Sequence, residues 1–152
     1  MTTLIIFGAK YLALLSPLIV LWLGVTKFRN EWQKFITILV ANLGLSYLFG
    51  LLARGVYYDP RPFVVESFTP LVAHLSDNGF LSDHTLLLAS LATSVGFFDK
   101  KFAALLWLIT ILVGTARVLA GVHHTIDILG SIVIALIVKW LVYFVLEQRK
   151  KV

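Results

Sequence analysis

The sequence predicts an all-α integral membrane protein, a bundle of about five transmembrane helices with an active site at the outer membrane face. Hydrophobic residues make up 59% of the 152 positions, and the mean hydropathy is +0.92. A run of about 20 apolar residues crosses the hydrocarbon core as a helix, because lipid offers the backbone no hydrogen bonds. The chain contains no cysteine, which excludes disulfides, thiolate metal sites and cysteine nucleophiles.

Five apolar segments have the length that a membrane crossing needs, or nearly so. They are predicted at residues 3–26, 35–54, 82–98, 102–120 and 126–146. The first is expected to stay in the protein, because the start MTTLIIFGAK lacks the basic region of a cleavable signal peptide. The third is the shortest and could begin inside the preceding loop. No polar segment is long enough to separate two domains, so residues 1–152 are expected to form one.

Lysine and arginine gather on one side of this topology. That side holds Lys27, Arg29, Lys34, Lys100, Lys101, Arg149, Lys150 and Lys151. The positive-inside rule makes it cytoplasmic, so the N-terminus is expected outside and the C-terminus inside. The 55–81 loop and the 121–125 turn then share the outer face. Lys10 and Lys139 fall inside predicted spans, and their long side chains are expected to extend toward an interface.

Three arginines lie on the predicted outer side, against the orientation signal. Arg54 ends the second span, and Arg117 lies near the end of the fourth. Arg61 stands between two prolines in the loop. A guanidinium presents a fixed fork of donors that suits phosphate or carboxylate. The three could converge on one anion at the membrane boundary, or they could pair with acidic residues of the same face or with lipid phosphates.

The segment FLSDHT, residues 80–85, opens the third span. Ser82 or Asp83 is a suitable helix N-cap, and the N–H groups of a first helical turn form a site for an anion. Ser82 could add a hydroxyl donor. His84 could exchange a proton near neutral pH. Taken alone, the segment supports no more than a plain helix cap with an interfacial histidine.

A third polar cluster follows in ARVLAGVHHTID. His123 and Asp127 are four residues apart, so a helix would place them on one face. An aspartate bonded to one ring nitrogen fixes the tautomer and leaves the other nitrogen free to attack. His124 is three residues before Asp127, so helical spacing does not choose between the histidines. His84 and Asp83 extend the set of possible metal ligands, but three arginines would repel a cation, so no metal and no cofactor are expected.

The three motifs, in this order, resemble the signature of the type 2 phosphatidic acid phosphatase superfamily. That signature reads Lys-x6-Arg-Pro, then Pro-Ser-Gly-His, then Ser-Arg-x5-His-x3-Asp. This chain has Arg54-x6-Arg61-Pro62, Leu81-Ser82-Asp83-His84 and Ala116-Arg117-x5-His123-x3-Asp127. It departs from the pattern at Arg54, Leu81, Asp83 and Ala116. Ser-Asp-His preceded by Asp-Asn-Gly-Phe is similar to bacterial undecaprenyl-diphosphate phosphatases of the bacitracin-resistance type. The family usually has six spans, one more than predicted here.

The resemblance implies a metal-independent phosphatase. His123, which fits the family spacing, would attack phosphorus and form a phosphohistidine. Asp127 would orient it, and His84 would protonate the leaving oxygen and then activate water. The resemblance assigns phosphate binding to Arg54, Arg61, Ser82, Asp83 and Arg117.

The implied substrate is a polyprenyl (undecaprenyl) diphosphate in a bacterial-type plasma membrane, hydrolysed to the monophosphate. Phosphatidylglycerol phosphate, phosphatidic acid and lipid A phosphates are alternatives, and so is a protein that binds or transports a phospholipid without cleaving it. The expected partners are the lipid substrate and the bilayer, with no nucleic acid. The sequence makes no prediction for the oligomeric state.

Three features stay open at this stage. Neither His74 nor His124 receives a role. Asp83, placed where an anion should bind, could cap the helix, pair with an arginine or stay protonated. Residues 63–75 could form a loop, a re-entrant segment or a helix that lies on the membrane.

Overall fold

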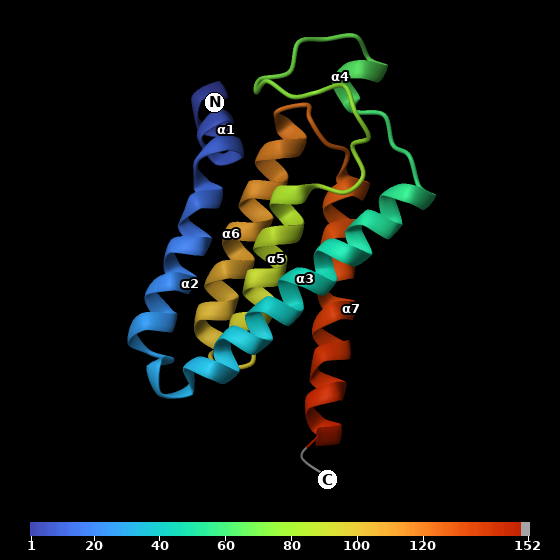
Figure 1. Ribbon diagram of the computed structural model, residues 1–152. Helices are drawn as coiled ribbons and strands as arrows, with labels where there is room; N and C mark the ends of the chain where they lie inside the picture. The colour runs from blue at the N-terminus through green and yellow to red at the C-terminus, as the bar shows by residue number, and fades with distance from the viewer. Residues whose placement is uncertain (150–152) are drawn as a thin grey trace.

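The computed structural model describes residues 1–149 as a bundle of helices, with no β-strand among them (Figure 1). The helices are α1 (Thr2–Lys10), α2 (Leu15–Thr26), α3 (Trp32–Val56), α4 (Pro62–Val65), α5 (Asp83–Val95), α6 (Lys100–Leu119) and α7 (Thr125–Arg149). Two 3₁₀ turns, Leu12–Leu14 and Arg29–Glu31, connect α1 to α2 and lead into α3. The predicted all-α class is confirmed. Lys150 and Lys151, used above for the orientation, lie outside the described residues.

Four helical segments are long and apolar enough to cross a membrane. They are Thr2–Thr26, Arg29–Val56, Lys100–Leu119 and Thr125–Gln148. Each includes most of a predicted span. The remaining predicted span, 82–98, contains α5, which has only 13 residues. Helix α5 is shorter than the predicted span because it ends at its C-cap, Gly96. The next helix, α6, begins soon after, where the Asp99 side chain accepts from the N–H groups of Lys101 and Phe102.

The short helix α5 lies at the centre of the bundle. It packs against α3, α6, α7 and α2, and ten of its 13 residues are buried. Small residues allow this close approach, as is common between membrane helices. The hydroxyls of Ser90 and Ser94 donate to the carbonyls of Leu86 and Ser90, each at 2.7 Å, so these buried polar groups are satisfied within the helix. From Thr85 on, α5 is therefore largely enclosed by the bundle, while Asp83 at its N-terminal end is exposed.

The loops rich in basic residues lie at one end of the bundle. Figure 1 shows the turn before α3, the turn before α6 and the end of α7 at that end, with the N-terminus, α4 and the long green loop at the other. A salt bridge between Lys27 and Asp99 joins the two turns. We call the end that carries α4 and the long loop the site end.

The two lysines within predicted spans have different surroundings. Lys10 ends α1 and is exposed. Lys139, on α7, is half-buried, and its amine lies beside the C-terminal end of α5, where a Cβ built on Gly96 would be 3.4 Å from Nζ. A positive charge there complements the partial negative charge of the last carbonyls of α5.

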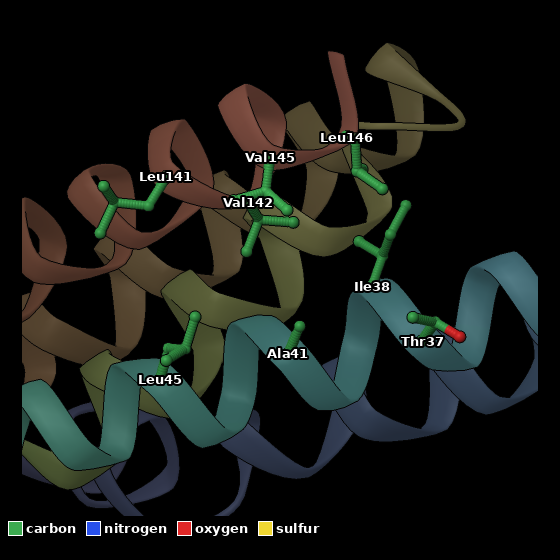
Figure 2. Close-up of a pocket in the computed structure, with 8 residues that line it drawn as sticks. All are labelled: Thr37, Ile38, Ala41, Leu45, Leu141, Val142, Val145 and Leu146. Atoms are coloured by element: carbon green, nitrogen blue, oxygen red, sulfur yellow. The ribbon is translucent and has the colours of Figure 1, made fainter. Parts of the chain in front are cut away.

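An apolar pocket of about 240 Å³ lies between α3 and α7, away from the site end (Figure 2). Its lining comes from the first half of α3 and the last part of α7, namely Thr37, Ile38, Ala41, Leu45, Leu141, Val142, Val145 and Leu146. Arg54 and Asp127 occupy the opposite ends of the same two helices. The pocket therefore lies apart from the candidate site.

Candidate active site

The predicted site residues gather at the site end, where the end of α3, the start of α5, the end of α6 and the start of α7 lie beneath the long loop (Figure 1). His123 is the most constrained of them. It lies in the turn before α7 and is 2% exposed. Its Nδ1 lies 3.1 Å from Asp127 Oδ2 and 3.1 Å from the Gly79 carbonyl oxygen. A carbonyl can only accept, so Nδ1 carries the hydrogen, and Nε2 keeps its lone pair.

The neighbouring His124 has a different partner. Its ring Nδ1 lies 2.8 Å from Asp59 Oδ2, while its backbone N–H donates to Asp127 Oδ2 at 2.9 Å. Asp127 thus accepts from the ring of His123 and from the backbone of His124. The helix begins at Thr125, so both histidines precede it, and the 3.6-residue period could not distinguish them.

Arg61 holds its guanidinium against Nε2 of His123, the ring nitrogen that carries no hydrogen. Its Nη1 lies 3.4 Å from His123 Nε2 and donates to the Val122 carbonyl at 2.8 Å. On the other side, Nε donates to Asp77 Oδ1 at 2.8 Å. Partial burial alone would raise the pKa of Asp77, but the hydrogen bond and charge of Arg61 lower it. Arg61 is 4% exposed, so a fixed positive group faces the position where Nε2 would meet an anion.

Arg54 and Asp83 form a salt bridge at the start of α5. Arg54 Nη2 also donates to the Leu81 carbonyl at 3.1 Å. Ser82 is the N-cap: its Oγ lies 3.5 Å from the N–H of Thr85 and accepts from the Thr85 hydroxyl at 3.2 Å. The sequence left open whether Asp83 caps the helix, pairs with an arginine or stays protonated. In the structure it pairs with Arg54. Arg54 and Asp83 both differ from the residues of the family motif, and the two form an ion pair with each other.

Arg117 is buried in the last turn of α6 and points toward α1. Its Nη1 donates to the Ala9 carbonyl at 3.3 Å. Its Nε is buried and has no hydrogen-bond partner within the described part of the chain. An unpaired buried donor is costly and calls for a partner, and an anion would supply one. Half-buried His84 lies within electrostatic range of Arg117 and His123.

The three arginines do not all converge freely on one point. Arg61 faces His123, Arg117 is tied to α1 by one hydrogen bond, and Arg54 is paired with Asp83. The sequence allowed the arginines either to converge on an anion or to pair with acidic residues, and the structure has some of each. Arg54 and Arg61 pair with aspartates, and Arg61 also faces His123.

Sequence reasoning gave no role to Asn78, which organises the loop around Arg61. Its Oδ1 accepts from the N–H groups of Asp59 and Phe80, both at 3.0 Å, and its Nδ2 donates to the Tyr57 carbonyl at 3.0 Å. The Asn-Gly dipeptide is a turn signal that could have identified this position. Adjacent Gly79 lies in a tight space, because a Cβ there would be 3.0 Å from the Asp59 carbonyl oxygen and 3.3 Å from Asp127 Oδ2.

His74 was also left open, and the structure brings it to the site. Its ring stands edge-on to the ring of His123, with 5.9 Å between centroids. Residues 63–75 form a loop that starts with the last three residues of α4. His74 lies in a segment without helical or strand periodicity, so only the folded structure of the loop shows that it reaches the site.

Comparison with known proteins gives the family. The sequence profile of the PAP2 superfamily matches residues 35–151. The chain belongs to the PAP2 superfamily. It is 32% identical over 144 residues to undecaprenyl-diphosphatase BcrC of Bacillus subtilis (strain 168), and the match covers 93% of this chain and 72% of that protein. The resemblance inferred from the three motifs is confirmed.

Two solved structures share the PAP2 fold of this chain. The crystal structure of Aquifex aeolicus LpxE aligns with a TM-score of 0.70 at 24% identity, covering 92% of this chain and 81% of that one. A transmembrane PAP2-type phosphatidylglycerolphosphate phosphatase from Bacillus subtilis aligns with a TM-score of 0.66 at 27% identity, covering 97% and 75%. The protein is therefore a membrane-embedded member of a lipid phosphatase family.

Proposed function

We propose that this PAP2 protein hydrolyses a polyprenyl (undecaprenyl) diphosphate to the monophosphate through a phosphohistidine on His123, without a metal ion. The observation that carries the proposal is the state of His123. Its Nδ1 is bonded to Asp127 and Gly79, and its Nε2 faces the guanidinium of Arg61. A nucleophile fixed in one tautomer beside a buried cation is arranged for attack on phosphorus.

In the first step, the Nε2 lone pair of His123 attacks the terminal phosphorus. The bond from that phosphorus to the bridging oxygen breaks, and the lipid monophosphate leaves with a proton from His84. Asp127 stabilises the imidazolium that forms, because its carboxylate already accepts from Nδ1. Arg61 and Arg117 balance the charge on the phosphoryl oxygens, and the N-terminal turn of α5 adds N–H donors.

In the second step, His84 accepts a proton from water, and the oxygen of that water attacks the phosphohistidine. The phosphorus–nitrogen bond breaks, inorganic phosphate leaves, and His123 returns to its neutral form. Ser82 and Asp83 contribute to phosphate binding through the start of α5, and Arg54 does so beside its partner Asp83. Positioning and charge supply most of the catalysis in phosphoryl transfer, and this chain offers both.

The site opens on the outer side of a bacterial-type plasma membrane, with the N-terminus outside and the C-terminus in the cytoplasm. This orientation is supported by the basic turns of Lys27 and Lys100, which lie at the other end of the bundle (Figure 1). A head group at the membrane boundary could then reach His123 while its lipid chain stays in the bilayer.

The activity is expected to persist at acidic pH. Burial and the charges of Arg117 and Arg61 lower the pKa of His123, although its bond to Asp127 acts in the opposite direction. The neutral ring is the nucleophile, so on the acid side activity falls when the pH drops through this lowered pKa. The acid limb of a kcat/KM profile should therefore have its midpoint below about 6.5, the value of a free imidazole.

Phosphate groups also ionise in this pH range, so the profile is measured with two substrates of different phosphate acidity. A midpoint that stays constant between them belongs to the enzyme. A constant midpoint above 6.5 would contradict the neutral, buried state assigned to His123.

The function is tested with a substrate panel. Purified protein is incubated in EDTA at matched detergent concentration with undecaprenyl diphosphate, phosphatidylglycerol phosphate, phosphatidic acid and a lipid A phosphate, with His123→Ala as the blank. The proposal expects the highest kcat/KM on the diphosphate. A higher value on phosphatidylglycerol phosphate would instead favour the activity for which the second structural neighbour is named. Tight lipid binding with no phosphate release over hours would favour a binding or transport protein.

EDTA is included to test metal independence, because one group of side chains could hold a cation. Ligand atoms of Asp59, His124 and Asp127 lie within 4.8 Å of one another. Two of them already pair, since His124 contacts Asp59. Activity that is lost in EDTA and restored by a divalent cation would contradict metal independence.

A further inference from the structure

His74 belongs to none of the three sequence motifs, yet it stands beside the nucleophile. Its ring lies edge-on to His123, at 5.9 Å between centroids and an interplanar angle of 77°. It is half-buried, and its Nδ1 lies 3.4 Å from the Leu75 carbonyl. That carbonyl can only accept, so Nδ1 carries a hydrogen, and Nε2 has no hydrogen-bond partner among residues 1–149. One nitrogen of the ring is thus available to a ligand.

The loop holds His74 in place from both sides. Before it, the N–H of Leu71 donates to the Ala120 carbonyl at 3.0 Å, and Val72 is buried against α1 and the end of α6. After it, Asp77 binds Arg61. Each anchor lies within three residues of His74, so the backbone that carries its ring is held at the site before any substrate arrives. Groups held in this way lose little freedom when they bind a ligand.

The positive charges of the site act on His74. Burial lowers its pKa, and the charges of Arg61, Arg117 and His123 lower it further, while the contact with Leu75 raises it. The ring therefore lies in the same positive field that would hold a phosphate. A bound polyanion offsets this field, and the ring can then take a proton from solvent and donate from both nitrogens.

The site has a specific need for another donor. Arg54 is paired with Asp83, a carboxylate at a position where the motif has glycine. The net positive charge near α5 is therefore smaller than three arginines would give. A diphosphate carries one more phosphate than a monoester, and that phosphate lies directly beside the one that meets His123. The ring of His74, 5.9 Å from that of His123 between centroids, is placed to donate to this second phosphate.

We propose that His74 is a substrate-binding residue of this site, and that its Nε2–H contacts the second phosphate of a diphosphate head group. The inference rests on the proposed function, because it concerns the same site and its diphosphate substrate. It makes His74 a specificity-determining residue: the contact is present with a diphosphate and absent with a monoester.

The test uses inorganic pyrophosphate and inorganic phosphate as competitive inhibitors of the full-length protein. Three variants separate the roles of the ring. His74→Ala removes it, His74→Phe keeps an aromatic ring beside His123 without a donor, and His74→Gln restores an N–H at a similar reach. Ser76→Ala, at an exposed position in the same loop, is the matched control. Size-exclusion chromatography and thermal unfolding check that each variant is folded.

His74→Ala and His74→Phe are expected to raise the inhibition constant of pyrophosphate about 10- to 100-fold, the value of a hydrogen bond to a charged group. The constant for phosphate should stay within about 2-fold, and His74→Gln should recover most of the pyrophosphate binding. Equal changes for both inhibitors, no change for either, or recovery by phenylalanine as complete as by glutamine would each overturn the inference. Phenylalanine recovery would assign His74 to ring packing alone.

Different results would contradict the proposed function and the inference about His74. The inhibition constants are measured with whichever lipid of the panel the wild-type protein hydrolyses. A wild type inactive on the polyprenyl diphosphate would contradict the proposed function. An unchanged ratio of the two inhibition constants in His74→Ala would overturn the inference about His74 alone.

Discussion

His123→Ala is expected to reduce hydrolysis of the lipid diphosphate by about 10⁴-fold or more, because removal of a nucleophile eliminates the covalent route. The alanine cannot attack phosphorus, and no neighbouring group replaces it, since the His124 ring is turned to Asp59. The measurement is kcat for phosphate release from purified, folded protein in detergent. Substrate binding should change far less than kcat, because Arg61 and Arg117 remain.

His124→Ala is the matched control, one residue further along the same turn. Its backbone N–H still donates to Asp127, so the orientation of His123 is kept. We expect kcat within about 10-fold of the wild type, which is much less than the loss of a nucleophile. A greater loss in His124→Ala than in His123→Ala would reverse the assignment of the two histidines.

Arg61→Ala is expected to lower kcat/KM by about 10³-fold, the upper range for loss of one donor to a developing oxyanion. Nη1 of Arg61 lies 3.4 Å from Nε2 of His123, and Arg61 also fixes the turn through Val122 and the loop through Asp77. Arg61→Lys should recover little, because an ammonium cannot make these three contacts at once. The measurement is kcat/KM on the best substrate of the panel.

Arg29→Lys serves as the control, since Arg29 is exposed at the other end of the bundle. It should leave kcat/KM unchanged. A loss of less than 10-fold in Arg61→Ala would mean that another group holds the phosphoryl oxygens. Arg117, with its unpaired Nε, would then be the first candidate.

Much of the fold could be predicted from the sequence, because a membrane leaves the backbone few choices. Apolar runs of about 20 residues identified the four long segments, although α3 begins at Trp32 and not at 35. Helix α5 was harder to predict. Its apolar residues continue past the glycine that ends it, so composition alone extended the predicted span to 98.

The residues of the site could be listed from the sequence, but their pairings could not. Spacing placed His123 and Asp127 within reach, and the structure has their side chains 3.1 Å apart. The same spacing allowed His124, and only the position of Asp59 shows why its ring turns away. Such contacts join segments that lie far apart in the chain, and no local pattern encodes them.

The loop between α4 and α5 contributed least to the prediction. It has no helical or strand period, so its residues could be assigned only through the groups that they meet. His74 meets His123, and Asp77 meets Arg61. Both contacts depend on how the loop folds over the helix ends.

The central claim, that His123 is the nucleophile of a lipid diphosphate phosphatase, is tested most directly by isolating the phosphoenzyme. Substrate labelled with ³²P at the terminal phosphate is mixed with excess protein in EDTA, the reaction is quenched within milliseconds, and the labelled peptide is mapped by mass spectrometry. We predict an acid-labile, base-stable phosphate on His123 that is absent from His123→Ala. Phosphate on His124, or product release at full rate with no labelled protein, would contradict the claim.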